Sequence, residues 1–283
     1  MKARRAICIS RAGGSCSAVE GALAGSGVNL AVEHHEGVPA DLANVALVVV
    51  DRAARQAAGA ALRTVKAPVI VVGDDLDDDA LVALMLDAPV SHLVGDPGDR
   101  DLGITSEKLA TGDLFGLEKY VAAGASVAER SVGDELGKRR AIDEICAWAE
   151  SVGARRPLVH RIASVTDELL MNALAAGDAR AVVRWAADAR TLAISVGDAN
   201  GALRQRDVIA HVRRAREERG RPMSAAGGAA GLGLYLVLAN VAALIVNVVP
   251  DRQTEVVCLF DLAARSARPA IGGLRSLHVF AGA

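Results

Sequence analysis

Aromatic side chains are scarce in this chain of 283 residues: they make up 2% of it, although 52% of its residues are hydrophobic. A core with so few rings has to be packed mainly with Ala, Val, Leu and Ile. Net charge is small as well, at −2 for neutral pH. Charge therefore gives no electrostatic reason to expect a nucleic acid or an anionic membrane as a partner.

Paired cysteines are also lacking. The four cysteines, Cys8, Cys16, Cys146 and Cys258, are scattered and form no CxxC pair. This spacing fits neither a disulfide framework nor a zinc site, and it indicates buried reduced thiols. The basic N-terminus is followed by an apolar run too short for a secretory signal. We therefore expect a cytoplasmic protein.

Charged residues are missing from residues 222–250, and residues 229–249 are long enough to span a bilayer. Four glycines near the start of this segment, Asn240 and Asn247 within it, and a β-branched run at its end argue against a membrane helix. A glycine loop followed by a buried helix and a buried strand accounts for these features better.

The first 112 residues alternate between strand-like and helix-like patterns. The expected strands are residues 6–10, 28–32, 46–50, 68–72 and 91–94, and the expected helices are residues 18–23, 53–65 and 78–86. Continuous apolar strands that alternate with helices predict an α/β fold with a parallel sheet covered on both faces.

This order of elements resembles a response-regulator receiver domain, in which Asp51 would stand at the position of the phosphorylated aspartate. The chain departs from that family where its chemistry resides. Arg11 and the residues after it replace the acidic pair that binds magnesium, Gly73 replaces the switch Thr or Ser, and Asp96 replaces the lysine. Phosphoryl transfer needs a metal and a cation. The resemblance therefore implies a pseudo-receiver over residues 1–112, which serves docking or homodimer formation.

The second half predicts a different architecture after a partly helical connector at residues 113–137. Residues 138–283 form the expected second domain, an α+β fold with helices on one face of a mixed sheet. Its expected helices are residues 138–151, a helix that starts at Pro157, residues 203–219 and residues 232–242. Its expected strands form two hairpins, residues 182–186 with 191–196 and residues 244–249 with 254–262.

Glu168 and Asn172 are four residues apart on the second of these helices, so they share one face. The amide oxygen of Asn172 can ligate magnesium, a hard cation that prefers oxygen ligands. The carboxylate of Glu168 can orient or deprotonate an attacking hydroxyl or water. The alternative is a polar helix face in solvent.

Asp198 directly follows an apolar strand, where its carboxylate can accept a hydrogen bond from an adenine amino group. Gly201 and Asn200, which can adopt positive φ, give the loop after it conformational freedom. The alternative is an aspartate that ends a strand in an ordinary turn. Thr254, on a later strand, carries no signal by itself.

Gly228, Gly231 and Gly233 precede the helix at residues 232–242. Glycines let the backbone approach phosphates closely, and a helix N-terminus supplies unpaired N–H groups. The arginine-rich segment at residues 204–221 also contains Asp207, Glu217 and Glu218. We interpret this segment as a solvated helix beside a lid rather than as a nucleic-acid surface.

Taken in order, these motifs over residues 139–262 resemble the GHKL (Bergerat-fold) ATP-binding domain, in the form found in anti-sigma-factor serine kinases and histidine kinases. The resemblance implies Asn172 as the magnesium ligand, Glu168 as the catalytic base and Asp198 as the adenine ligand. It implies further nucleotide contacts at Gly201, Gly228, Gly231, Gly233 and Thr254. In the family, the aspartate that matches Asp198 begins the motif Asp-x-Gly-x-Gly. Here one of the two glycines is displaced to Gly201, and the other is absent.

The implied function is signal transduction, with ATP and Mg²⁺ as ligands and another signalling protein as the partner. The chain would act as a regulatory serine-kinase-like protein or as a nucleotide-gated switch. A non-enzymatic interaction scaffold, in which both halves have lost their chemistry, is the alternative. Autonomous ATPase activity is a weaker third choice.

Overall fold

The computed structural model describes residues 4–10, 16–25, 27–73, 90–96, 100–175, 180–203, 207–208, 210, 232–262 and 274–282. The chain divides into two compact units. Unit 1 consists of Met1–Leu114 with Arg275–Phe280, and unit 2 of Phe115–Leu274 with Ala281–Ala283. Each unit combines helices with a β-sheet, so the protein belongs to the α/β class.

Unit 1 is built on a parallel sheet with the strand order β2-β1-β3-β4-β5. The strands are β1 (Arg5–Ile9), β2 (Ala31–His35), β3 (Val45–Asp51), β4 (Val69–Val72) and β5 (Val90–Val94). The five central residues of β3 are all buried. This burial is the reason why the strand is continuously apolar, since both of its faces are covered.

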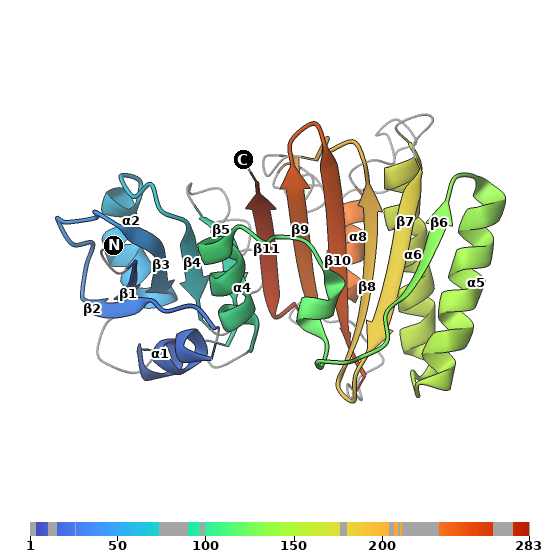
Figure 1. Ribbon diagram of the computed structural model, residues 1–283, viewed down its shortest axis with the longest axis horizontal. Coiled ribbons are helices and arrows are strands. Elements are labelled where there is room, and N and C mark those ends of the chain that lie inside the picture. The colour runs from blue at the N-terminus through green and yellow to red at the C-terminus, as the bar shows by residue number, and fades with distance from the viewer. Residues whose placement is uncertain are drawn as a thin grey trace, which may run out of the picture. The chain divides into compact units, whose positions relative to one another are not determined.

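Described helices lie on both faces of this sheet (Figure 1). They are α1 (Cys16–Ala24), α2 (Arg52–Leu62) and α4 (Arg100–Thr111). Val19 and Leu23 of α1 pack with Leu102 of α4 against the strands in one hydrophobic cluster. The side chain of Asp51 caps α2, because it accepts a hydrogen bond from the backbone N–H of Ala54 at 2.5 Å.

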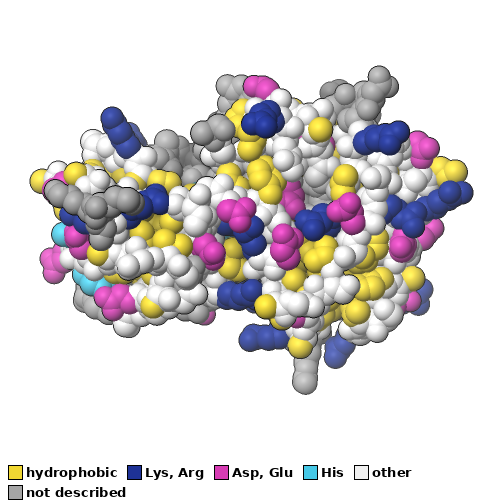
Figure 2. All heavy atoms as spheres, in the orientation of Figure 1, with side chains coloured by type: hydrophobic (Ala, Val, Ile, Leu, Met, Phe, Trp, Pro, Cys, Tyr) yellow, Lys and Arg dark blue, Asp and Glu magenta, His cyan; other side chains and the backbone are white. Residues whose placement is uncertain are grey.

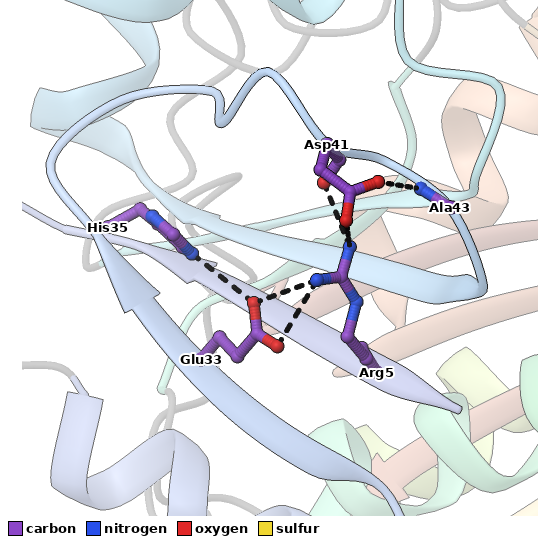
Figure 3. Close-up of polar contacts among 5 residues, drawn as sticks. All are labelled: Arg5, Glu33, His35, Asp41 and Ala43. Carbon is purple, nitrogen blue, oxygen red and sulfur yellow. Dashed lines mark hydrogen bonds and ion pairs between the residues drawn. The ribbon is translucent and has the colours of Figure 1, made fainter. Parts of the chain in front are cut away.

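Polar contacts hold the N-terminal end of β1 to its neighbours (Figure 3). The Arg5 guanidinium lies 3.3 Å from the Glu33 carboxylate on β2, and it donates to the backbone carbonyl of Asp41 at 2.8 Å. His35 lies 3.5 Å from the same Glu33. These groups are partly exposed, so each ion pair stabilises the fold by no more than about 1 kcal/mol.

Three features of unit 1 differ from the sequence-based expectation. The strand expected at residues 28–32 lies at Ala31–His35, where it pairs with β1. Helix α4 lies within residues 1–112 at a place where the sequence analysis expected no helix. A further strand, β11 (Ser276–Ala281), pairs antiparallel with β5. The helix expected at residues 78–86 lies outside the described residues.

The domain limits change accordingly. The sequence analysis assigned residues 1–112 to the first domain and residues 138–283 to the second. The first unit extends to Leu114 and also contains Arg275–Phe280. Arg275–Phe280 belongs to the first unit because β11 pairs with β5. This pairing connects segments about 180 residues apart in sequence, and no local sequence pattern predicts it.

Unit 2 contains an antiparallel sheet with the order β9-β10-β8-β7-β6. Its strands are β6 (Ala128–Val132), β7 (Ala181–Ala187), β8 (Thr191–Asp198), β9 (Ala243–Val249) and β10 (Gln253–Asp261). Both hairpins expected from the sequence, β7–β8 and β9–β10, are present. Asp251 forms the turn of the second hairpin with a positive φ of 60°.

Helices cover one face of this sheet, while the 3-10 helix η1 (Leu117–Tyr120) crosses the other (Figure 1). The helices are α5 (Glu135–Ser151), α6 (Arg156–Leu174) and α8 (Leu232–Asn240). Proline in the first turn of α6 costs no hydrogen bond, and Ile162, Val165 and Leu169 are buried at helical spacing.

The connector expected at residues 113–137 contains a strand that the sequence analysis missed, β6, and α5 begins within it at Glu135. Glu255 anchors the connector to the sheet, because its Oε2 accepts from the backbone N–H of Gly116 and from Nδ2 of Asn247, each at 3.0 Å.

The viewed face of unit 2 mixes acidic and basic side chains (Figure 2). Among the ion pairs of unit 2, Arg184 on β7 lies 3.3 Å from the carboxylates of both Glu118 and Glu129.

The uncharged segment at residues 222–250 does not form a single long helix in its described part. Its helix α8 ends at Asn240 and is followed by the strand β9. Within the described residues, we find no helix with both the length and the apolar character needed to cross a bilayer.

Unit 2 offers a direct test of helix capping. The Asp134 carboxylate caps α5 by accepting from the backbone N–H of Gly137 at 2.6 Å. Asp134→Ala should lower the free energy of unfolding by about 0.5–2 kcal/mol. Both tryptophans, Trp148 and Trp185, belong to unit 2, so urea unfolding followed by tryptophan fluorescence measures this change.

The matched control is Asp143→Ala on an exposed position of the same helix. It should change the unfolding free energy by less than about 0.5 kcal/mol. Equal effects of the two substitutions would contradict the capping role of Asp134.

Candidate functional site

A cavity of about 320 Å³ lies in unit 2, where α6 and the start of α8 face the strands β8, β9 and β10. Its walls are mostly apolar, with a few polar groups among them, which is typical of sites for small organic ligands. The lining residues are Leu169, Asn172, Ala173, Val196, Asp198, Asn200, Ala202, Leu203, Asp207, Leu234, Val246, Thr254 and Val256.

The register of the strands builds the floor of this cavity. Asp198 on β8 lies directly opposite Thr254 on β10, and Val196 lies opposite Val256. Val256 in turn lies opposite Val246 on β9. Directly opposite residues of an antiparallel pair share a face. The pairing therefore sets one polar pair beside three valines on the side that α6 covers.

Asp198 is half-buried at the end of β8. Its Oδ1 accepts a hydrogen bond from the backbone N–H of Asn200 at 2.8 Å. Burial raises the pKa of the Asp198 carboxyl above its ordinary value, although the backbone N–H groups of Asn200 and Gly201 oppose this shift. A ligand that donates a hydrogen bond to this carboxylate would compensate for part of its lost hydration.

Gly201 fixes the loop after Asp198 against the β9–β10 turn. It has a positive φ of 56°, and a Cβ at this position would lie 2.2 Å from the carbonyl oxygen of Val249. The carbonyl of Gly201 accepts from the backbone N–H of Asp251 at 3.2 Å. Only glycine fits here without movement of the backbone. Asn200, for which the sequence allowed positive φ, is not among the described residues with positive φ.

Glu168 and Asn172 form a hydrogen-bonded pair on α6, with Nδ2 of Asn172 donating to Oε1 of Glu168 at 3.0 Å. The bond occupies the amide nitrogen, so the amide oxygen is the atom left for a cation. Glu168 does not line the cavity itself, but its neighbour Leu169 and its partner Asn172 do. The pair therefore stands at the rim of the cavity.

Gly233, in the first turn of α8, lies against the carboxylate of Glu168. A Cβ at residue 233 would come within 1.6 Å of Oε1 and 2.2 Å of the carboxyl carbon of Glu168. The next residue, Leu234, lines the cavity. The absence of a side chain at Gly233 thus lets the Glu168 carboxylate lie against the start of α8.

A salt bridge holds the motif helix α6 to its neighbour α5. Nζ of Lys138 on α5 lies 2.8 Å from the carboxylate of Asp167 on α6 and 3.1 Å from that of Glu135. The hydrogen bond to Asp167 raises the pKa of Lys138, although partial burial opposes this shift. Because Asp167 precedes Glu168, this contact orients the turn of α6 that carries the pair.

The structure brings together several of the site residues expected from the sequence. Asn172, Asp198 and Thr254 line one cavity. Gly201 lies between two lining residues, and Glu168 contacts both Asn172 and Gly233. Gly228 and Gly231 lie outside the described residues.

Two polar residues of the cavity were missed by the sequence analysis as ligand contacts, Asn200 and Asp207. Asn200 was considered only for its backbone, and Asp207 was interpreted as part of a solvated helix. Nothing local in the sequence distinguishes Asp207 from Glu217 or Glu218. Its place at the cavity depends on tertiary packing, which sequence spacing does not reveal.

The structure describes no group of three or more His, Cys, Asp or Glu side chains that could hold a metal ion within its described ranges. Asn172 and Glu168 alone offer too few donor atoms to hold a cation without further ligands. Such a small set of donors suits Mg²⁺, because Mg²⁺ keeps several waters and takes ligand phosphates together with one or two protein oxygens.

Comparison with known proteins adds no family assignment, because neither the family models nor the curated proteins searched match this chain.

The close fit at Gly201 leads to a prediction. Gly201→Ala should destabilise unit 2 more than Gly124→Ala, by about 1–3 kcal/mol in urea unfolding, because a new Cβ would overlap backbone atoms. Gly124 has a comparable φ of 82° with open space around it, so it isolates the cost of the backbone conformation. Equal losses for the two variants would show that the loop moves aside freely.

Proposed function

We propose that unit 2 binds ATP with Mg²⁺ in the cavity of α6, β8 and β10, in the manner of a GHKL-type domain, and that the protein acts in signal transduction. The observation that carries the proposal is the convergence of Asn172, Asp198 and Thr254 on one cavity. These residues come from one helix and two strands that are distant in sequence.

The chemistry of the walls supports adenine as the buried part of the ligand. Val196, Val246 and Val256 offer a flat apolar surface for a purine ring. The Asp198 carboxylate at its edge accepts a hydrogen bond from the exocyclic amino group, and the Thr254 hydroxyl lies beside it in the paired strand. A base that lacks an amino group at this position would leave a half-buried carboxylate unpaired, which is costly.

The charge of the cavity supports a requirement for Mg²⁺. Its described lining contains two carboxylates, Asp198 and Asp207, and no Lys or Arg. A triphosphate therefore needs compensation from elsewhere. Mg²⁺ supplies it by bridging phosphate oxygens, with the amide oxygen of Asn172 as its protein ligand. Backbone N–H groups at the start of α8 add a further favourable interaction.

In a catalytic form of this site, Glu168 orients or deprotonates the Ser or Thr hydroxyl of a partner protein. Glu168 is well placed for that role because it lies one helical turn from Asn172 and accepts its hydrogen bond. In a regulatory form, nucleotide binding alone changes the surface offered to another signalling protein.

Unit 1 fits the part of a docking module in this proposal. Asp51, which stands where receiver domains carry their phosphorylated aspartate, uses its carboxylate to cap α2. The residues that would bind magnesium and stabilise a phosphoryl group there are replaced in the sequence. Unit 1 thus contributes contacts rather than phosphoryl transfer, and the protein works in the cytoplasm.

Isothermal titration calorimetry tests the proposal. Mg²⁺–ATP should bind the full chain, and Asn172→Ala should weaken that binding by about tenfold or more, which corresponds to about 1.4 kcal/mol. The difference should shrink when Mg²⁺ is removed with a chelator, because the lost interaction is with the cation.

Asn240→Ala is the matched control, since Asn240 lies outside the cavity and donates to the carbonyl of Leu236 in its own helix. It should leave ATP affinity unchanged. Absence of heat with the wild-type chain at millimolar Mg²⁺–ATP, together with no thermal shift, would defeat the proposal and favour the non-enzymatic scaffold.

A further inference from the structure

Unit 1 contains four ionisable side chains that are buried together where α4 faces β5 and β11. They are His92 on β5, Asp101 and Lys108 on α4, and His278 on β11, which we call the buried cluster. Their exposed fractions are 2%, 9%, 1% and 0%, respectively. Ionisable groups are rarely buried to this degree unless they are paired.

The register of β11 brings one half of the buried cluster together. β11 runs antiparallel to β5, so that His278 lies opposite His92 with ring centroids 5.6 Å apart. The backbone N–H of Gly95 donates to the carbonyl of Arg275 at 2.6 Å. A Cβ on residue 95 would come within 2.9 Å of that carbonyl oxygen, so glycine permits this close approach.

Helix α4 supplies the other half. Asp101 and Lys108 are seven residues apart, or two helical turns, and so lie on one face. Nε2 of His278 donates to Oδ2 of Asp101 at 2.9 Å. The amino group of Lys108 lies 3.9 Å from the centroid of the Phe280 ring, a cation–π distance. Two positions of β11 therefore make specific contacts with α4.

A proton on His92 would find no free carboxylate in the buried cluster, because its one carboxylate, Asp101, is already paired with His278. Nδ1 of His92 is buried and has no hydrogen-bond partner among the residues that the structure describes. A proton at this atom would add an unpaired positive charge in a site that already holds Lys108.

We infer that β11 is a pH-operated latch: it docks on β5 and α4 while His92 is neutral, and it is released when His92 takes up a proton. β10, the preceding strand that the structure describes, belongs to unit 2, whereas β11 up to Phe280 belongs to unit 1. Release of the latch would therefore detach the C-terminal strand from unit 1.

The direction of the pH effect follows from the neighbours of His92. Burial, followed by the nearby His278 and Lys108, lowers the pKa of His92 well below its ordinary value of 6.5. A released β11 returns the pKa of His92 toward that value. The docked state therefore binds fewer protons than the released state, and docking weakens as the pH falls below about 6.5, by about tenfold per pH unit.

The other groups around His92 do not reverse this direction. Burial would raise the pKa of Asp101, but His278, Ser276 and Lys108 together hold it below its ordinary value of 3.8. Asp101 thus stays ionised across the range in which His92 responds. β4, on the other side of β5, carries only Val and Ile. His92 is therefore the group that senses pH.

Hydrogen–deuterium exchange of the full chain between pH 7.5 and pH 5.5 tests the latch. After correction for intrinsic exchange rates, protection of the peptide that covers Ser276–Ala281 should fall about tenfold from pH 6.5 to pH 5.5. The peptide that covers Val45–Asp51 is the internal reference in the same unit, and it should keep its protection. Uniform protection of β11 over the whole range would overturn the inference.

His92→Gln removes the titrating group and should abolish the pH dependence of β11 protection. His34→Gln is the matched control on β2, because the side chain of His34 is 39% exposed and pairs with Glu20 outside the buried cluster. It should behave as the wild type. A wild-type pH dependence in His92→Gln would overturn the inference.

A measurement without substitution covers the case in which His92→Gln does not fold. Histidine ring NMR of the wild-type chain should show that His92 stays neutral at every pH at which β11 remains protected. Protonation of His92 near pH 6.5 with β11 still protected would contradict the latch.

Discussion

The antiparallel pairing of β8 with β10 is the constraint on which the candidate site depends. It places Asp198 opposite Thr254, and Val196 opposite Val256, on the face that α6 covers. A slip of one residue would turn both polar side chains to the other face of the sheet. The loop after β8 is fixed to the β9–β10 turn by the close approach at Gly201. The same pairing therefore determines the floor of the cavity and the position of the carboxylate at its edge.

The two units use buried polar groups in different ways. In unit 2, Asp198 keeps part of its capacity for hydrogen bonds directed into a cavity. In unit 1, the hydrogen bond between Asp101 and His278 helps to specify where the last strand docks. Asp51 likewise serves as a helix cap. Buried polar contacts of this kind add little net stability, but a mismatched alternative pairing would leave them unsatisfied. This difference is the physical reason to look for ligand chemistry in unit 2 and for docking in unit 1.

The sequence predicts the parts of the fold whose signal is local. Continuous apolar runs such as β3, and buried positions at helical spacing such as those of α6, identify their own elements. The sequence does not predict β6, because the charged residues Glu129 and Arg130 interrupt the apolar pattern of this edge strand. It does not predict β11 either, because the partner strand β5 is far away in the chain. In the site, the spacing of Glu168 and Asn172 predicts their shared helix face. The contributions of Asp207 and of the close contact between Gly233 and Glu168 arise only from tertiary packing.

Methyl NMR of the full chain, titrated with a non-hydrolysable ATP analogue and Mg²⁺, tests the central claim most directly. The claim is that the cavity between α6 and the β8–β10 pair is the nucleotide site. It predicts large shifts for the methyl groups of Leu169, Val196, Val246 and Val256, which line that cavity. Methyl groups in the core of unit 1, such as those of Leu47 and Val49, should stay unchanged. Unperturbed cavity methyl groups at a saturating concentration of the analogue would contradict the account.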